Sequence, residues 1–175
     1  MQIQKIFLFG IDNAGKTSLS QALRTGIVNP DNKPTKAFDV TDLILRDFEK
    51  NTEFKIWDAP GQVTFRKTWG RGMDAANMMV FVLDTADKKR FEEAKKVLQQ
   101  VTNDLETRVT PLIFLYHKVD LPEAKANLGD AQKFFKSALV SDRKTYIFKT
   151  SVKEPETIAE LKKTIGNIAQ ESRWG

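Results

Sequence analysis

A ten-residue segment near the N-terminus, GIDNAGKTSL (10–19), constrains the fold more than any other part of the chain. It follows directly on the apolar run IFLF (6–9) and precedes a stretch that reads as a helix. Gly10, Gly15, Lys16 and Thr17 satisfy the pattern GxxxxGK[ST]. In a strand–loop–helix context this pattern is typical of a loop that wraps around phosphate.

The residue types in this loop suit a phosphate group. Successive backbone N–H groups can curl around a β-phosphate, and a side chain at Gly10 or Gly15 would block or strain that path. Lys16 would reach the β- and γ-phosphates, the Thr17 hydroxyl would ligate Mg²⁺, and the helix N-terminus would add a favourable dipole. The alternative is a glycine cap and turn with an exposed Lys16, and the flanking strand and helix favour the phosphate loop.

Short apolar runs alternate with stretches of helical period along the rest of the chain, notably at residues 91–101 and 158–168. The runs that we expect to form strands span residues 6–9, 43–48, 54–57, 78–83, 111–116 and 145–148. Only residues 49–53 join two strands without room for a helix, so this pair should be an antiparallel hairpin. The pattern predicts one α/β domain over residues 1–175, a doubly wound, six-stranded, mostly parallel sheet with helices on both faces.

Composition excludes several other classes of protein. The chain contains no cysteine, which excludes a disulfide framework, a thiolate metal site and prenylation, and suits the cytoplasm. No apolar run approaches the roughly 20 residues that a membrane span needs. The net charge of +5 comes from Lys and Arg spread along the chain, and no aromatic residues interleave with a basic stripe. We therefore expect no nucleic-acid partner, while peripheral membrane contact stays open.

The segment KIWDAPGQ (55–62) carries a second set of polar groups after a predicted strand. Asp58 could hold Mg²⁺ through a water molecule, and the backbone amide of Gly61 could sense a γ-phosphate. The Gln62 side chain can both accept from and donate to an attacking water. Asp58 alone could simply end a strand, but together with the phosphate loop it predicts nucleotide hydrolysis.

The segment HKVD (117–120) follows the predicted fifth strand and bears on the choice of base. Asp120 can accept two hydrogen bonds from guanine, whereas adenine would leave that carboxylate unpaired. The aliphatic stem of Lys118 can lie over the base, and the backbone N–H of Ser151 is placed to meet the guanine oxygen. We expect the only histidine, His117, to tie the base-binding loop to the phosphate loop by a hydrogen bond rather than to act in catalysis.

With these residues assembled, the sequence resembles the small GTPases, a group of P-loop NTPases, and most of all the Arf family. GIDNAGKTSL is similar to the phosphate loop of that family, KPTKAFDV (33–40) to its first switch and IWDAPGQ (56–62) to its second. The segments FRKTW (65–69) and FVLDTADKKRFEEAKKVL (81–98) also look like Arf sequences. The resemblance spans nearly the whole chain.

The resemblance implies a GTP/GDP site with Mg²⁺. In that reading Thr35 joins Mg²⁺ with Thr17 and Asp58, and the groups that act in hydrolysis are Gln62, Lys16 and Gly61. The nucleotide would be bound by Asp12, Asn13, Ala14, Gly15, Lys16, Thr17, Ser18, Thr35, Gly61, His117, Lys118, Asp120, Ser151 and Val152.

Several positions depart from the Arf pattern. His117 stands where the guanine motif usually has Asn, and residues 150–158 also look more like the Rag GTPases. Pro60 and Ala37 replace family glycines; Pro60 is again similar to one Rag branch, and it removes a backbone N–H before Gly61. Residue 2 is Gln and the start of the chain shows no amphipathic helix, so we expect no intrinsic lipid anchor.

Two functions follow as hypotheses. The first is a cytoplasmic GTP-dependent switch with slow hydrolysis, protein effectors, an exchange factor and a GTPase activator that supplies an arginine. The second is a Rag-like GTP-binding scaffold or dimerisation module, paired through its switch face, in which turnover hardly matters. Gln62 favours the first, because an inert scaffold does not need a residue that orients water.

Overall fold

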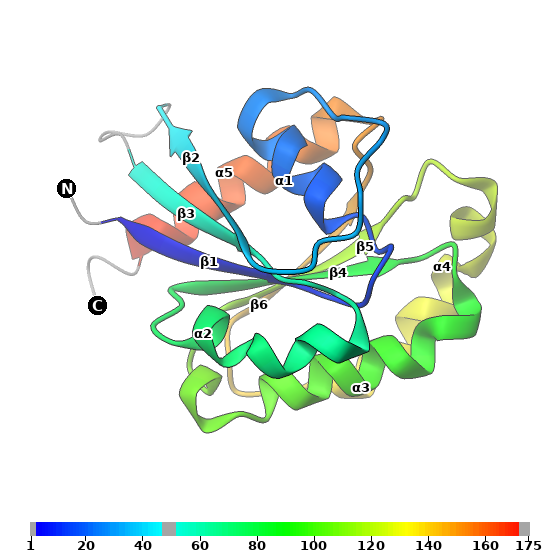
Figure 1. Cartoon of the computed structure of the whole chain (residues 1–175). Coiled ribbons are helices and arrows are strands. Elements are labelled where there is room, and N and C mark those ends of the chain that lie inside the picture. The colour runs from blue at the N-terminus through cyan, green and yellow to red at the C-terminus, as the bar shows by residue number, and fades with distance from the viewer. Residues whose placement is uncertain (1–2, 47–51, 172–175) are drawn as a thin grey trace.

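A central sheet lies between two layers of helices (Figure 1). This computed structural model describes residues 3–46 and 52–171. The strands are β1 Gln4–Phe9, β2 Asp39–Leu45, β3 Thr52–Asp58, β4 Met78–Asp84, β5 Leu112–His117 and β6 Thr145–Thr150. The α-helices are α1 Lys16–Thr25, α2 Gly70–Met73, α3 Phe91–Thr102, α4 Pro122–Phe135 and α5 Pro155–Glu171. Short 3-10 helices span Val63–Thr68, Lys88–Arg90, Leu105–Thr107 and Lys136–Ala138.

The strands form one sheet in the order β2-β3-β1-β4-β5-β6. β2 runs antiparallel to β3, and all the other neighbouring pairs are parallel. The sequence prediction of a six-stranded, mostly parallel sheet with one antiparallel strand is confirmed. Each parallel connection passes through a helical segment, as crossovers between parallel strands require.

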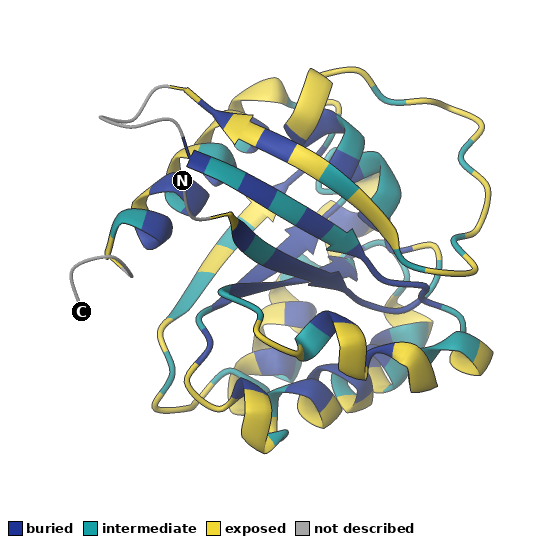
Figure 2. Ribbon diagram, turned by 60° about the vertical axis from the view of Figure 1, so that its left-hand side comes forward, coloured by how far each residue is buried: buried dark blue, intermediate teal, exposed yellow. Residues whose placement is uncertain are grey.

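The apolar runs of the central strands are continuous because both of their faces are covered. In β1, Ile6 and Leu8 belong to the hydrophobic cluster on one side of the sheet, and Phe7 and Phe9 to the cluster on the other. This alternation follows the two-residue period of a strand. Figure 2 shows the result as buried central strands between helices that are exposed only on their outer faces.

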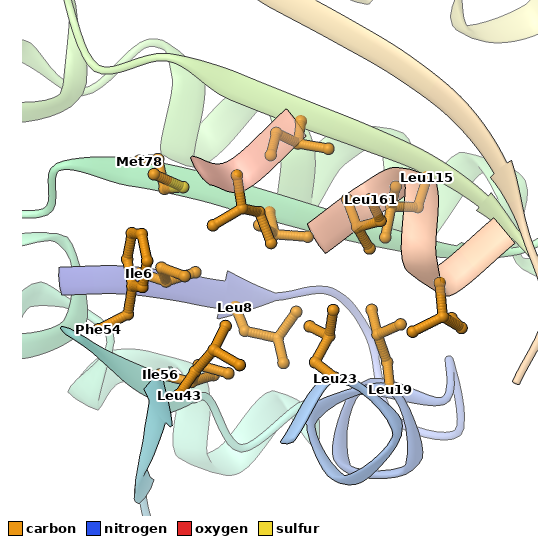
Figure 3. Close-up of a cluster of buried hydrophobic side chains, with 14 of the residues drawn as sticks. Ile6, Leu8, Leu19, Leu23, Leu43, Phe54, Ile56, Met78, Leu115 and Leu161 are labelled. Carbon is orange, nitrogen blue, oxygen red and sulfur yellow. The ribbon is translucent and has the colours of Figure 1, made fainter. Parts of the chain in front are cut away.

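Each face of the sheet has its own hydrophobic cluster. On one face α1 and α5 contribute Leu19, Leu23 and Leu161, which pack against strand residues such as Ile6 and Leu115 (Figure 3). On the other face α3 and α4 cover a cluster rich in aromatic residues, which also includes Trp69. The two clusters bury both faces of the central strands, at whose ends the site loops begin.

The edge strand β2 begins earlier than expected. The prediction placed a strand at residues 43–48, but β2 starts at Asp39, which pairs with Asp58 of β3. Residues 39–42 lack a strong strand signal, and their pairing depends on β3. The predicted link at 49–53 lies largely outside the described residues, which resume at Thr52.

Candidate functional site

A cleft of about 300 Å³ lies where the loops after β1 and β3 meet residues 30–35. It is lined by Asp12, Asn13, Gly15, Lys16, Thr17, Ser18, Pro30, Asn32, Lys33, Pro34, Thr35, Gly61, Gln62 and Lys118. These loops follow the carboxyl ends of strands, which is where open α/β sheets bind ligands. The structure thus brings the predicted phosphate-binding residues and both predicted switches to one place.

Two glycines of the loop after β1 have no room for a side chain. Gly10 has a φ of +151°, and a Cβ there would lie 2.6 Å from the carbonyl oxygen of Val82. Gly15 has a φ of +100°, and its Cβ would lie 2.8 Å from Cδ2 of His117. The glycines are therefore required, as predicted, but the atoms in the way belong to β4 and β5.

Lys16 is the first residue of α1 and is only 6% exposed. Its Nζ donates a hydrogen bond of 2.7 Å to the carbonyl oxygen of Ile11, across the loop. Burial lowers the pKa of Lys16 to about 8, against the attraction of Asp58 and Asp12. A phosphate beside this ammonium would favour its charged form, because an opposite charge at close range raises the pKa of a lysine.

Three hydroxyl and carboxylate groups predicted to hold Mg²⁺ meet at one point. Thr17 Oγ1 donates a 2.6 Å hydrogen bond to Asp58 Oδ2 and lies 3.0 Å from Thr35 Oγ1. They come from the phosphate loop, the end of β3 and the first switch, up to 41 positions apart. The spacing of the sequence motifs could not show this contact, although Thr17, Thr35 and Asp58 were each expected to hold Mg²⁺.

The chemistry of this group fits a hard cation. Asp58 is 1% exposed, and its Oδ1 is a buried oxygen without a hydrogen-bond partner. Burial raises the pKa of Asp58 to about 6, although the Thr17 hydrogen bond and the Lys16 charge oppose the rise. Mg²⁺ prefers oxygen ligands and keeps several waters and phosphate oxygens, so it needs no cage of carboxylates. Across residues 3–46 and 52–171, no group of three or more His, Cys, Asp or Glu is arranged for a metal.

The loop after β3 lies directly on the phosphate loop. A Cβ at Gly61 would lie 2.5 Å from both Asp12 N and Lys16 Nζ, so only glycine fits. Trp69 Nε1 donates a 2.9 Å hydrogen bond to the carbonyl oxygen of Pro60, and Arg66 Nε donates one of 2.8 Å to that of Gly61. The peptide planes on both sides of Gly61 are therefore held by side chains. Gln62, next in the chain, lines the cleft.

The residue just before the first switch, Asn32, is tied to α1 through side-chain amides. Asn32 Nδ2 donates a 3.0 Å hydrogen bond to Ser18 Oγ, and Gln21 Nε2 donates one of 2.9 Å to Asn32 Oδ1. Further along, Phe38 packs edge-on against Trp57 of β3, with 5.4 Å between the ring centroids. These contacts set the path that brings Thr35 to Thr17.

A second hollow of about 210 Å³ adjoins the cleft at the ends of β5 and β6. It is lined by Gly15, Ser18, His117, Lys118, Asp120, Leu121, Ser151, Val152 and Lys153. Lys118 Nζ donates hydrogen bonds of 2.7 Å to the Asn13 carbonyl oxygen and 2.6 Å to Asp84 Oδ2. The lysine head is thereby fixed, and its aliphatic stem lies along the hollow. Ser151 Oγ donates a 2.5 Å hydrogen bond to Asp120 Oδ1, which orients the carboxylate.

Two expectations about this hollow need correction. The backbone N–H of Ser151 donates to Thr157 Oγ1 at 3.1 Å, so it is engaged within its own loop. His117 touches the phosphate loop by packing on Gly15, but its hydrogen bond, 2.8 Å from Nδ1, is with Thr150 Oγ1 of β6. Imidazole is longer than an asparagine side chain, which explains why the ring fills the space beside Gly15.

The sequence predictions missed a group of charged residues beside the cleft. Arg66, Arg90 and Glu93, together with the predicted Asp12, form a continuous set of ion pairs, which we call the Asp12 cluster. Asp84, the partner of Lys118, was also missed. Arg90 and Glu93 are three positions apart. The members of the other pairs lie 27 to 78 positions apart in the chain, so no local signal identifies them.

Comparisons with known proteins agree with this geometry. A model of the ADP-ribosylation factor family matches residues 1–168. ADP-ribosylation factor-like protein 8d of Arabidopsis thaliana is 29% identical over 157 residues, covering 90% of this chain and 86% of that protein. The structure of the small GTPase Arl6 (BBS3) from Trypanosoma brucei, with the bound nucleotide analogue GppNp, is similar in fold. Its TM-score is 0.80 at 20% identity, and the match covers 99% of this chain and 100% of that one.

Proposed function

Since the chain belongs to the ADP-ribosylation factor family of small GTPases, we propose that its cleft binds GTP with Mg²⁺ and hydrolyses it to GDP and phosphate. Family membership makes the protein a GTPase and a GTP-dependent switch. One observation supports the assignment of the site above all others. Thr17, Thr35 and Asp58 converge within hydrogen-bond distance, while Gly61 lies against Asp12 and Lys16.

The hollow beside the cleft would take guanine. Asp120, oriented by Ser151, would accept the two N–H groups of the base edge, and the stem of Lys118 would cover one face. We assign the contact with the guanine oxygen to the backbone N–H of Val152, because that of Ser151 is bonded to Thr157. The His117 ring would pack against Gly15 and so set the distance between the base-binding hollow and the phosphate loop.

Lys16 would bind the β- and γ-phosphates, with the backbone of residues 12–18 around them. Thr17 and Thr35 would hold Mg²⁺ directly and Asp58 through a water, which fits the unpaired Oδ1. When bound, Mg²⁺ would neutralise charge on the phosphate oxygens. Gly61 and Thr35 would keep both switch loops closed on the γ-phosphate and release them when it leaves.

Gln62 would orient the water that attacks the γ-phosphate, with the backbone amide of Gly61 at the phosphate. The first switch (33–40) contains no arginine, and Arg66 and Arg90 are engaged in the Asp12 cluster. We therefore expect slow intrinsic hydrolysis and a partner protein that supplies an arginine, worth about a thousandfold or more in rate.

The family implies effectors and regulators as partners, and an exchange factor and a GTPase activator are proposed here. We also propose that residues 1–175 form one G domain that works in the cytoplasm. In the described part of the chain, no helix combines the length and apolarity needed to cross a membrane. The Rag-like scaffold rests on His117, Pro60 and residues 150–158 alone, and the family match gives it no support.

Replacing Gln62 with Leu tests the catalytic assignment. Loss of the water-orienting amide should slow single-turnover GTP hydrolysis about tenfold or more. The affinities for GTP and GDP should change by less than about threefold, because Gln62 acts on water rather than on the ground-state nucleotide. Gln100→Leu, the same chemical change on an exposed position of α3, is the matched control. An unchanged hydrolysis rate in Gln62→Leu would favour the scaffold.

A further inference from the structure

The Asp12 cluster joins the phosphate loop, the second switch and α3. Arg90 donates from NH2 to Asp12 Oδ1 at 2.7 Å and from Nε to Glu93 Oε2 at 2.9 Å. Arg66 donates from NH2 to Glu93 Oε1 at 2.6 Å. The side chain of Arg66 is 12% exposed and those of Asp12 and Arg90 are both 28% exposed, so solvent screens these pairs less than ordinary surface pairs.

Asp12 is an acidic residue in the lining of a cleft that is otherwise suited to phosphate. Its backbone N lies 2.5 Å from the position that a Cβ at Gly61 would take. A free carboxylate there would repel a polyphosphate, because like charges at close range disfavour each other. Arg90 removes that conflict with two contacts, to the side chain and to the carbonyl oxygen of Asp12. The Arg90 hydrogen bond also lowers the pKa of Asp12, so the carboxylate stays ionised and paired.

The other end of the cluster reaches the proposed water-orienting residue. Glu93 accepts from both arginines, one with each oxygen, and so fixes Arg66 relative to Arg90. Arg66 Nε in turn donates to the carbonyl oxygen of Gly61, which belongs to the peptide bond between Gly61 and Gln62. The ionic state of Asp12 and the orientation of this peptide are thus linked through three side chains.

We propose that Arg90 is a positioning and specificity-determining residue of the nucleotide site. It neutralises Asp12 beside the terminal phosphate, and through Glu93 and Arg66 it holds the second switch on α3. The inference rests on the proposed function, since it assigns the Gly61 end of the cleft to the γ-phosphate. GTP carries more negative charge than GDP at that end, so loss of Arg90 should penalise GTP more than GDP.

The test measures the affinities of the whole 1–175 chain for GTP and GDP, by displacement of fluorescent GDP in the presence of Mg²⁺. In Arg90→Ala, affinity for GTP should fall about tenfold, within the usual range of coupling between interacting sites, and that for GDP less than about threefold. In an Asp12→Asn background, the same replacement should change GTP affinity less than about threefold, because no carboxylate remains to be neutralised. Arg90→Lys, which keeps the charge, should recover most of the GTP affinity.

Lys88→Ala is the matched control. Lys88 lies on the same 3-10 helix as Arg90 and pairs with Asp130 on the surface, where both side chains are 56% exposed. Equal losses for GTP and GDP in Arg90→Ala would overturn the proposal, as would an undiminished GTP loss in the Asp12→Asn background. If the wild-type protein fails to prefer guanine nucleotides over ATP, the proposed function fails instead, and the two failures are distinguishable.

A second variant covers the case in which Arg90→Ala does not fold. Glu93→Gln keeps the shape of the side chain but weakens its hold on both arginines. It should slow single-turnover GTP hydrolysis about tenfold through the Gly61–Gln62 peptide, while GDP affinity stays within about threefold. A wild-type rate of hydrolysis in Glu93→Gln would overturn the link between Arg90 and the second switch.

Discussion

His117 is the residue in which this chain departs most clearly from the usual guanine motif. It is 2% exposed, bonded to Thr150 Oγ1 and packed on Gly15. Burial and the neighbouring Lys118 charge lower its pKa to about 4, against the attraction of Asp84 and Asp120. The ring is therefore neutral at physiological pH and acts as a rigid spacer between β5, β6 and the phosphate loop.

The stability of the protein should depend on pH through His117. As the pH falls from about 6.5 to about 4, the unfolded chain gains a proton on this residue but the native state does not. Native-state stability is lost across that window and retained above it. Measured by urea unfolding, the loss between pH 7.5 and 5 should be about 2 kcal/mol smaller in His117→Asn than in the wild type.

This effect is isolated by comparing how the free energy of unfolding changes with pH in the two proteins, rather than by comparing its absolute values. Asp58, whose raised pKa changes stability in the opposite sense, is present in both proteins and cancels. An identical pH dependence in the two proteins would show that His117 is not buried in its neutral form.

Sequence spacing predicted which residues of the individual motifs meet in the cleft. Lys16, Thr17 and Asp58 were identified because the phosphate loop and the strand end each have a fixed local pattern. Arg66 and Glu93 were not, because their contact depends on how the 3-10 helix after the second switch packs on α3. The engaged N–H of Ser151 was missed because the Thr157 hydroxyl that accepts it comes from the start of α5.

In the antiparallel pair β2–β3, two neighbouring apolar residues differ in burial. Leu43 and Ile44 are neighbours in β2, but their side chains point to opposite faces of the sheet. Leu43 is 2% exposed and belongs to the cluster under α1 and α5 (Figure 3). Ile44 is 51% exposed. A strand on the edge of a sheet thus keeps one buried face and one open face.

Alanine replacements in this pair should differ sharply in their cost. Leu43→Ala leaves a cavity in the core and should lower the free energy of unfolding by about 2–4 kcal/mol. Ile44→Ala removes an exposed side chain and should cost less than about 1 kcal/mol, mainly through lower strand propensity. Equal costs in urea unfolding would mean that the register of β2 on β3 differs from the one described here.

The elements were predictable where their own residues define them. β1, β4 and β5 are continuous apolar runs bounded by polar turns, and α3 and α5 carry a clear apolar stripe. The start of β2 at Asp39 was not predictable, because residues 39–42 are polar or exposed and are ordered by pairing with β3. Pairing between strands is a tertiary effect that overrides weak local preference.

Over the whole molecule, the strand order explains why separate motifs form one site. β1 lies between β3 and β4, and β5 between β4 and β6, so the loops after these strands meet at the carboxyl edge of the sheet. The fold class and the convergence of the motifs followed from the sequence, because each motif sits at a strand end. The Asp12 cluster did not, since it requires the start of α3 to be placed close to the phosphate loop.

The cleft and the hollow beside it are proposed to bind guanine nucleotides with Mg²⁺. Competition of unlabelled GTP, XTP and ATP against fluorescent GDP on the purified protein tests this proposal. GTP should displace the probe about a hundredfold better than ATP, because adenine does not present the two N–H donors that the partly buried Asp120 carboxylate would accept from guanine. Asp120→Asn should shift the preference towards XTP. Equal competition by ATP and GTP would contradict the account, because Asp120 would then not read the base.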